Sequence, residues 1–184
     1  ISACLRFAYI EGYLAPSPSG KEAAIKLREL AHNNGVKVAF TLSDPGIVEN
    51  FRNELKEIIG EGIDLLFCNE DEAMGFTEQS SVDAALQELK KYAGSIVITR
   101  GGEGAWAWDG DHLHEIPAKK IKPVDTNGAG DMFAGAFLYA VTAGHDYDSA
   151  GRLASAACAE VISDFGPRIS GEAHERLRTE VLGS

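Results

Sequence analysis

The stretch from residue 125 to residue 133, D-T-N-G-A-G-D-M-F, places acids and glycines directly ahead of a long apolar run. Gly128, Ala129 and Gly130 carry little side-chain bulk, so the backbone there can adopt turns that are closed to most residues. A small-residue loop that opens a helix presents unpaired N–H groups and the positive end of the helix dipole, which suits a phosphate. Asp131 follows in the first turn, where its carboxylate could accept a proton from an attacking hydroxyl. These residue types indicate phosphoryl transfer.

The same residues also have a purely structural interpretation. Acidic residues favour helix N-termini for dipole reasons alone, and Gly-Ala-Gly can be only a tight turn. The stretch by itself therefore leaves both a phosphate site and a capped turn open.

The elements ahead of this loop alternate between strands and helices. Apolar runs and helical spacing predict strands over 5–10, 36–42, 63–68 and 95–99, and helices over 21–34, 47–59 and 82–92. We expect Ser19 to cap the first of these helices. The alternation is typical of parallel β-α-β units in a doubly wound sheet. Asn69 and Thr99 then stand at the carboxyl ends of consecutive strands, the edge where such sheets bind ligands.

The pattern changes in the second half of the chain. The runs 105–108 and 112–116 flank Asp109-Gly110-Asp111, which predicts a β-hairpin. Helices are expected over 132–143 and 148–165, with a short final helix near Gly171. We therefore predict an α/β fold: a mainly parallel, doubly wound sheet with helices on both faces and a hairpin at one edge.

Other patterns favour structural roles. Gly101–Gly104 leads into a strand, which excludes a dinucleotide-binding loop. His112 and His114 share a strand face but lack a third metal ligand nearby, so we expect a solvent-facing hairpin edge. Asp44 is expected to be a capping or solvated acid.

Three segments, in order, resemble the ribokinase/PfkB family of small-molecule kinases. Asn69–Glu72 matches its N-x-x-E motif, Thr99–Gly104 matches its T-x-G-x-x-G segment, and Asp125–Asp131 resembles its second signature. The segments D-T-N-G-A-G-D-M-F and L-F-C-N-E-D-E-A are most similar to the adenosine-kinase-like branch. The resemblance covers nearly the whole chain.

The resemblance implies a role for each matching residue. Asp131 would be the catalytic base, and the anion hole would be formed by Gly128, Ala129, Gly130 and Asp131. Asn69 and Glu72 would organise Mg²⁺ and its water shell, whereas the nucleotide would be bound by Thr99, Arg100, Gly101 and Gly104. Ser155 stands where some relatives contact adenine, and Asp125 where several relatives hold a monovalent cation such as K⁺.

The implied function is an ATP- and Mg²⁺-dependent kinase that transfers the γ-phosphate to a hydroxymethyl group of a sugar or nucleoside. Two alternatives stay open: a kinase for fructose or ribose, and a regulatory relative that binds nucleotide without catalysis. Family members begin with a Gly-Gly signature, a lid and an acidic residue that grips the acceptor, and none follows Ile1 here. We expect residues 1–184 to be the C-terminal nucleotide-binding and catalytic part of one ribokinase-like domain, inactive alone.

Composition narrows the classes of partner. The net charge of −11 argues against a nucleic-acid partner, because such binding needs Lys and Arg to neutralise phosphates. The longest apolar stretch, 132–143, is shorter than the roughly 20 residues of a membrane span. Cys4, Cys68 and Cys158 are widely spaced, which favours reduced thiols and a cytoplasmic location. A small-molecule substrate is expected, and a homodimer is a compatible assembly.

Overall fold

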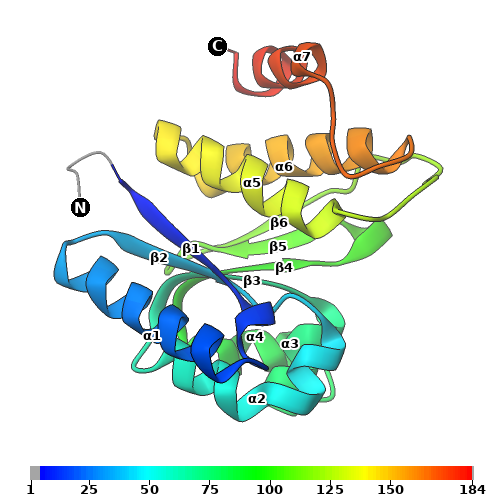
Figure 1. Ribbon diagram of the computed structural model, residues 1–184. Coiled ribbons are helices and arrows are strands. Elements are labelled where there is room, and N and C mark those ends of the chain that lie inside the picture. Colours follow the sequence, from blue (N-terminus) through cyan, green and yellow to red (C-terminus); the bar gives the residue numbers. More distant parts are fainter. Residues whose placement is uncertain (1–4, 184) are drawn as a thin grey trace. The chain divides into compact units, whose positions relative to one another are not determined.

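The computed structural model describes residues 5–183. They form two compact units that divide between Ile98 and Thr99, each with its own buried core. Figure 1 shows the elements of both units. The predicted membership of both units in a single ribokinase-like domain stays a prediction.

The first unit is built from strands that follow one another in the sheet and from helices that connect them. The strands are β1 (Phe7–Glu11), β2 (Lys37–Thr41), β3 (Ile63–Asn69) and β4 (Ala93–Thr99), whose last residue begins the second unit. β1 pairs with β2 and β2 with β3, both in parallel, as predicted. Leu65, Leu66 and Ile96 of these strands are fully buried.

Four helices of this unit gather on one face of its strands (Figure 1). They are α1 (Pro18–Asn33), α2 (Pro45–Ile59), α3 (Glu70–Thr77) and α4 (Val82–Leu89). The short 3₁₀ turn η1 (Gly12–Leu14) lies in this unit, and a second one, η2 (Gly101–Glu103), lies in the second unit. Asp44 caps α2 by accepting a hydrogen bond from the Gly46 N–H, which confirms its capping role. α4 ends at Leu89, short of the predicted residue 92.

The predicted cap of the first helix was wrong. α1 begins at Pro18, and the hydroxyl of Ser17, not of Ser19, accepts the hydrogen bond from the Gly20 N–H at 3.2 Å. Proline suits the first helical position because its φ is already helical and because that position needs no N–H donor. The helix therefore starts three residues earlier than the apolar spacing indicated.

The second unit contains the predicted hairpin and three helices. β5 (Ala105–Trp108) and β6 (Leu113–Ile116) pair in antiparallel, with Trp108 opposite Leu113. The helices are α5 (Ala129–Ala143), α6 (Tyr147–Ile162) and α7 (Gly171–Leu182). α5 and α6 lie side by side, and α6 packs on both hairpin strands. A Cβ on Gly151 would come within 2.5 Å of the Ile116 side chain, so this glycine lets α6 approach the hairpin closely.

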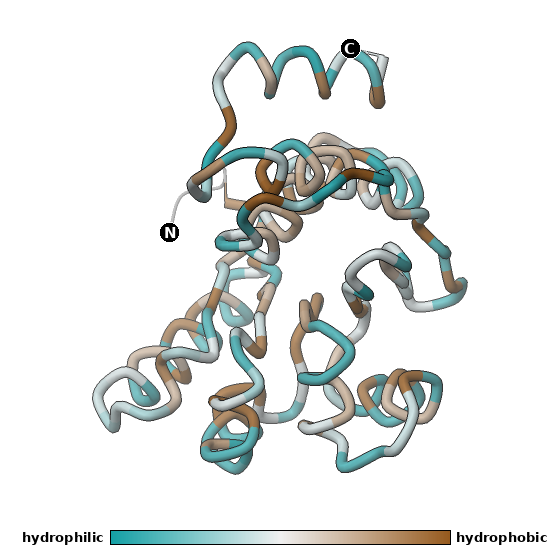
Figure 2. The backbone as a smooth tube through the Cα atoms, turned by 90° about the vertical axis from the view of Figure 1, so that its right-hand side faces the viewer, coloured by the Kyte–Doolittle hydropathy of each residue, from teal (hydrophilic) through white to brown (hydrophobic). Residues whose placement is uncertain are grey.

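The outer helix α7 packs on α6, with Ala173 and Leu177 as its buried residues. Along α7, which ends at the C label in Figure 2, hydrophilic and hydrophobic segments alternate. α6 ends at Ile162, three residues before the predicted end. Within residues 5–183, no helix combines the length and hydropathy that crossing a bilayer requires.

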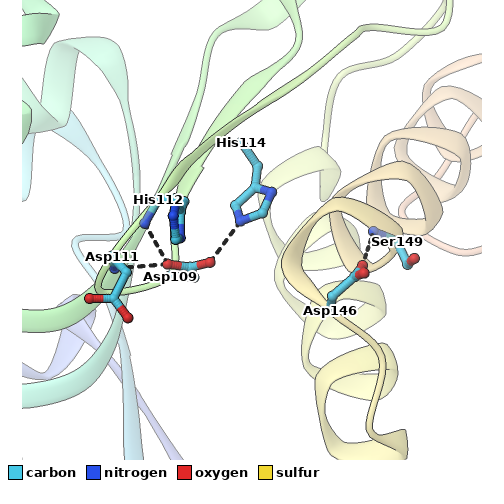
Figure 3. A network of polar contacts seen from close by, with 6 residues as sticks. All are labelled: Asp109, Asp111, His112, His114, Asp146 and Ser149. Carbon is cyan, nitrogen blue, oxygen red and sulfur yellow. Dashed lines mark hydrogen bonds and ion pairs between the residues drawn. The ribbon is translucent and has the colours of Figure 1, made fainter.

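The turn of the hairpin is organised around the carboxylate of Asp109 (Figure 3). Its Oδ1 accepts hydrogen bonds from the N–H groups of Asp111 (2.8 Å) and His112 (2.7 Å). Its Oδ2 lies 2.8 Å from Nε2 of His114. These contacts, first of all the one with His114, hold the pKa of Asp109 well below its usual range. The expectation that both histidines simply face solvent was therefore wrong for His114, because Asp109 offers it a partner.

Replacing Asp109 by alanine is expected to lower the free energy of unfolding by about 1–2 kcal/mol at neutral pH, because the turn loses an acceptor for two N–H groups. The difference from the unsubstituted protein should shrink as the pH falls below 4, because a lowered pKa contributes stability only while the carboxylate is ionised. Denaturant unfolding between pH 7 and pH 3 measures both effects. Asp111→Ala, an exposed acid in the same turn, is the control; equal losses in both variants would contradict the role of Asp109.

Candidate active site

The loop ahead of α5 has the geometry of an anion site. Gly128 is the N-cap, with φ of 73°, and a Cβ there would lie 2.6 Å from Cβ of Pro167, so only glycine fits. α5 begins at Ala129 instead of the predicted Met132, because the small residues join the first helical turn. The N–H groups of Ala129 and Met132 donate to carbonyls of the loop, at 3.3 and 2.9 Å.

The two N–H groups between them are different. Within the described residues, the backbone N–H groups of Gly130 and Asp131 have no hydrogen-bond acceptor. Nothing lies within 4 Å of the position that a Cβ on Gly130 would occupy, so the space beside it is open. The Asp131 side chain is exposed in the same turn. A helix N-terminus with free donors and open space can receive an anion, with a carboxylate at its edge.

A cavity of about 510 Å³ in the second unit borders this loop. It brings together six predicted site residues: Thr99, Gly101, Gly104, Ala129, Gly130 and Ser155. Sequence reasoning missed the other residues that line it: Gly102, Ala118, Lys119, Lys120, Ile121, Pro123, Thr126, Phe133, Cys158, Ala159 and Ile162. Apolar side chains from α5 and α6 thus face glycine-rich backbone and two lysines, a mixture suited to a ligand with an apolar and an anionic end.

Two predicted residues connect the segments around this cavity: Asp125, which does not line it, and Ser155, which does. Oδ1 of Asp125 accepts from the Asn127 N–H at 2.9 Å, and Oδ2 accepts from the Gly166 N–H at 3.3 Å. Asp125 thereby ties the anion loop to the segment that follows α6. The Ser155 hydroxyl donates to the carbonyl of Pro117 at 2.9 Å, which anchors the chain leaving β6.

The turn from Arg100 to Gly104 forms another wall. The Arg100 N–H donates to the Gly104 carbonyl at 2.7 Å, and the Arg100 guanidinium lies over the Trp106 ring, 4.4 Å from its centroid. The same guanidinium pairs with Glu103 at 2.6 Å. Arg100 is therefore directed to its own turn and hairpin and does not line the cavity, and its predicted contact with a nucleotide stays a prediction.

Asn69 and Glu72 lie in the first unit, where they form a capping box at the start of α3. Oδ1 of Asn69 accepts from the Glu72 N–H at 2.8 Å. In return, the two carboxylate oxygens of Glu72 accept from the Asn69 side-chain amide (2.7 Å) and backbone N–H (3.0 Å). Glu72 is 5% exposed, and burial raises its pKa to about 7 in spite of the hydrogen bond from Asn69.

Asp131 does not line the 510 Å³ cavity; it lines a second cavity, of about 570 Å³, inside the second unit. α5, α6 and α7 surround it, and Tyr139, His174, Glu175 and Arg178 are among its lining residues. Its presence leaves the Asp131 carboxylate with space beyond the anion loop.

Replacing Gly104 by alanine should disrupt the cavity wall. Gly104 has φ of 99°, and a Cβ there would lie 1.9 Å from the carbonyl oxygen of Ile116, so the turn must move away from β6. We expect a loss of at least about 2 kcal/mol in the free energy of unfolding. Denaturant unfolding is the measurement, and Gly102→Ala is the matched control, because a Cβ on Gly102 meets nothing within 4 Å. Similar stability of the two variants would contradict the close packing of this turn against Ile116 of β6.

The Glu72 carboxyl should make stability depend on pH. Because its pKa is raised to about 7 from 4.5, the folded protein binds a proton more tightly than the unfolded chain between these values. The free energy of unfolding contributed by Glu72 should therefore decline as the pH rises from about 4.5 to about 7. Denaturant unfolding in Mg²⁺-free buffer should show a shallower decline for Glu72→Gln than for the unsubstituted protein. An identical slope in both would contradict the buried, proton-binding carboxyl.

Comparisons with known proteins agree with the motifs. Residues 3–174 match the family model of the pfkB family carbohydrate kinases. A cytidine kinase of Thermococcus kodakarensis is 34% identical over 82% of this chain and 55% of its own length. An adenosine kinase of Saccharomyces cerevisiae is 30% identical over 89% of this chain and 51% of its own length.

A solved structure extends the likeness to the fold. The structure of adenosine kinase from Sinorhizobium meliloti superimposes with a TM-score of 0.89 at 32% identity, over 95% of this chain and 54% of that chain. The chain thus spans about half the length of the relatives it matches. The predicted ribokinase-like α/β fold is confirmed, and the relatives are named kinases, phosphotransferases with an alcohol acceptor. This chain belongs to the pfkB family of carbohydrate kinases.

Proposed function

We propose that the protein acts as an ATP- and Mg²⁺-dependent kinase that transfers the γ-phosphate to a hydroxymethyl group of a sugar or nucleoside. One observation carries the proposal: the unpaired N–H groups of Gly130 and Asp131 lie in one helical turn with the exposed Asp131 carboxylate, and Gly130 lines the 510 Å³ cavity. Free donors and a carboxylate in one helical turn are what a transferring phosphate and an attacking hydroxyl require.

Asp131 would accept or orient the proton of the acceptor hydroxyl while its oxygen attacks the γ-phosphorus. Within the anion hole of Gly128, Ala129, Gly130 and Asp131, the unpaired N–H groups of Gly130 and Asp131 would stabilise the negative charge that develops on the phosphate. The nucleotide would lie in the cavity against Thr99, Gly101, Gly104 and Ser155.

Asn69 and Glu72 fit a role in holding Mg²⁺ through its water shell. Carboxylate and amide oxygens are ligands that magnesium prefers, and each Glu72 oxygen has acceptor capacity beyond its bond from Asn69. When bound, the ion would neutralise charge on the phosphate oxygens. We assign a monovalent cation such as K⁺ to the vicinity of Asp125, whose carboxylate is held by two backbone N–H groups.

The relatives named cytidine kinase and adenosine kinase favour a nucleoside acceptor. Ribose and fructose are the alternative acceptors. A regulatory relative that binds nucleotide without catalysis would have no chemical need for the exposed Asp131 carboxylate, which speaks against that class. Cys68 and Cys158 are free thiols, in keeping with a cytoplasmic location, whereas Cys4 lies outside the described residues. A homodimer is the assembly we propose to test.

Asp131→Asn should reduce turnover by roughly 10²- to 10⁴-fold, the usual contribution of a general base, while ATP affinity stays within a few-fold. The assay measures ADP release with a coupled enzyme system, using the whole protein and each of six acceptors in turn: cytidine, adenosine, inosine, guanosine, ribose and fructose. Asp148→Asn is the control, because this acid lies on α6 and pairs with Arg152. Near-normal turnover by Asp131→Asn would refute the assigned role, and no turnover with any acceptor in the unsubstituted protein would favour the regulatory class.

A further inference from the structure

We propose that Lys119 and Lys120 bind the phosphate groups of the nucleotide, a role that rests on the proposed function of the cavity. Both lysines line the 510 Å³ cavity, together with Thr126 and Gly130 of the anion loop. Neither residue belongs to a motif that the sequence analysis singled out. We assign this role to them because the segment between β6 and α5 places both lysines at the cavity.

The charge around these lysines is unusual for this protein. The whole chain carries a net charge of −11, yet residues 118–124 hold three lysines and no acid. Within residues 5–183, neither Lys119, Lys120 nor Lys122 forms an ion pair or a hydrogen bond. Elsewhere basic side chains do find acids, as Arg152 does with Asp148 and Arg176 with Glu160. Unpaired ammonium groups beside a cavity create a positive field that favours an anionic ligand.

The segment that carries the lysines is fixed at both ends to α6. The Ser155 hydroxyl holds the carbonyl of Pro117 at 2.9 Å, and the Val124 N–H donates to the carbonyl of Ile162 at 2.8 Å. Ser155 and Ile162 themselves line the cavity. The lysines therefore lie on a short span whose two anchors belong to the wall of the cavity, which keeps their ammonium groups at its border.

The cavity lining contains groups that suit the base of a nucleotide and groups that suit its phosphates. Phe133, Ala159 and Ile162 offer apolar contact, which suits a base. An ammonium group is a compact point charge that binds phosphate oxygens and gains little from a neutral base. Lysine contacts should therefore strengthen binding in proportion to the number of phosphates on the ligand.

The test compares binding of ATP, ADP, AMP and adenosine by titration calorimetry, at low and high KCl, using the full chain. For the double variant Lys119→Gln/Lys120→Gln, we expect the Kd for ATP to rise about 10- to 100-fold. The Kd for AMP should rise less, and the Kd for adenosine should stay unchanged. The dependence of ATP affinity on KCl should also become shallower. Unchanged unfolding midpoints would show that the fold is intact.

Lys122→Gln is the matched control, because Lys122 lies in the same segment but does not line the cavity. Lys26→Gln, an exposed position on α1, controls for net charge alone. Equal weakening by Lys122→Gln or Lys26→Gln would overturn the proposal in favour of a long-range charge effect, and an unchanged ATP affinity in the double variant would overturn it outright. If the unsubstituted protein binds none of the phosphorylated ligands, the proposed function fails; if it binds ATP and the double variant binds equally well, only the lysine proposal fails.

Discussion

The candidate site depends on a backbone constraint at Gly128. Gly128 has a left-handed conformation, lies against Pro167 and turns the chain into α5. As a result, the N–H groups of Gly130 and Asp131 in the first turn of α5 lack acceptors. A side chain at Gly128 would be strained in its φ and would collide with Pro167. Because unpaired donors at a helix start must find a partner in water or in a ligand, the geometry of one glycine determines where an anion can bind.

The rest of the second unit holds this loop in place with few but well-placed contacts. Asp125 connects it to the chain after α6, and Ser155 connects α6 to the chain after β6. Gly151 allows α6 to lie close to the hairpin through Ile116. The cavity is therefore bounded by α5, α6 and the turns around them, which these two hydrogen bonds and the close contact at Gly151 hold together inside one unit.

Local signals predicted much of the fold. Asp109-Gly110-Asp111 predicted the hairpin, and alternating apolar runs predicted the parallel strands, because both depend on neighbouring residues. The start of α1 was missed because apolar spacing gives no information about a proline in the first turn. The cavity could be predicted only in its motif residues. Lys119, Lys120 and the apolar side of α6 reach it through tertiary packing, and Arg100 turns away from it because Trp106 and Glu103 attract its guanidinium.

The reciprocal bonds of Asn69 and Glu72 bear on how this family can vary. The two side chains that the proposed chemistry needs near a metal also close the first turn of α3 on each other. A change at either position would weaken the start of α3 and, under the proposed function, the metal site as well, so the folding of this helix by itself constrains both residues. The presence of this pair in a distant relative would consequently indicate a helix cap as much as an activity. A relative without the pair should have another N-cap for that helix.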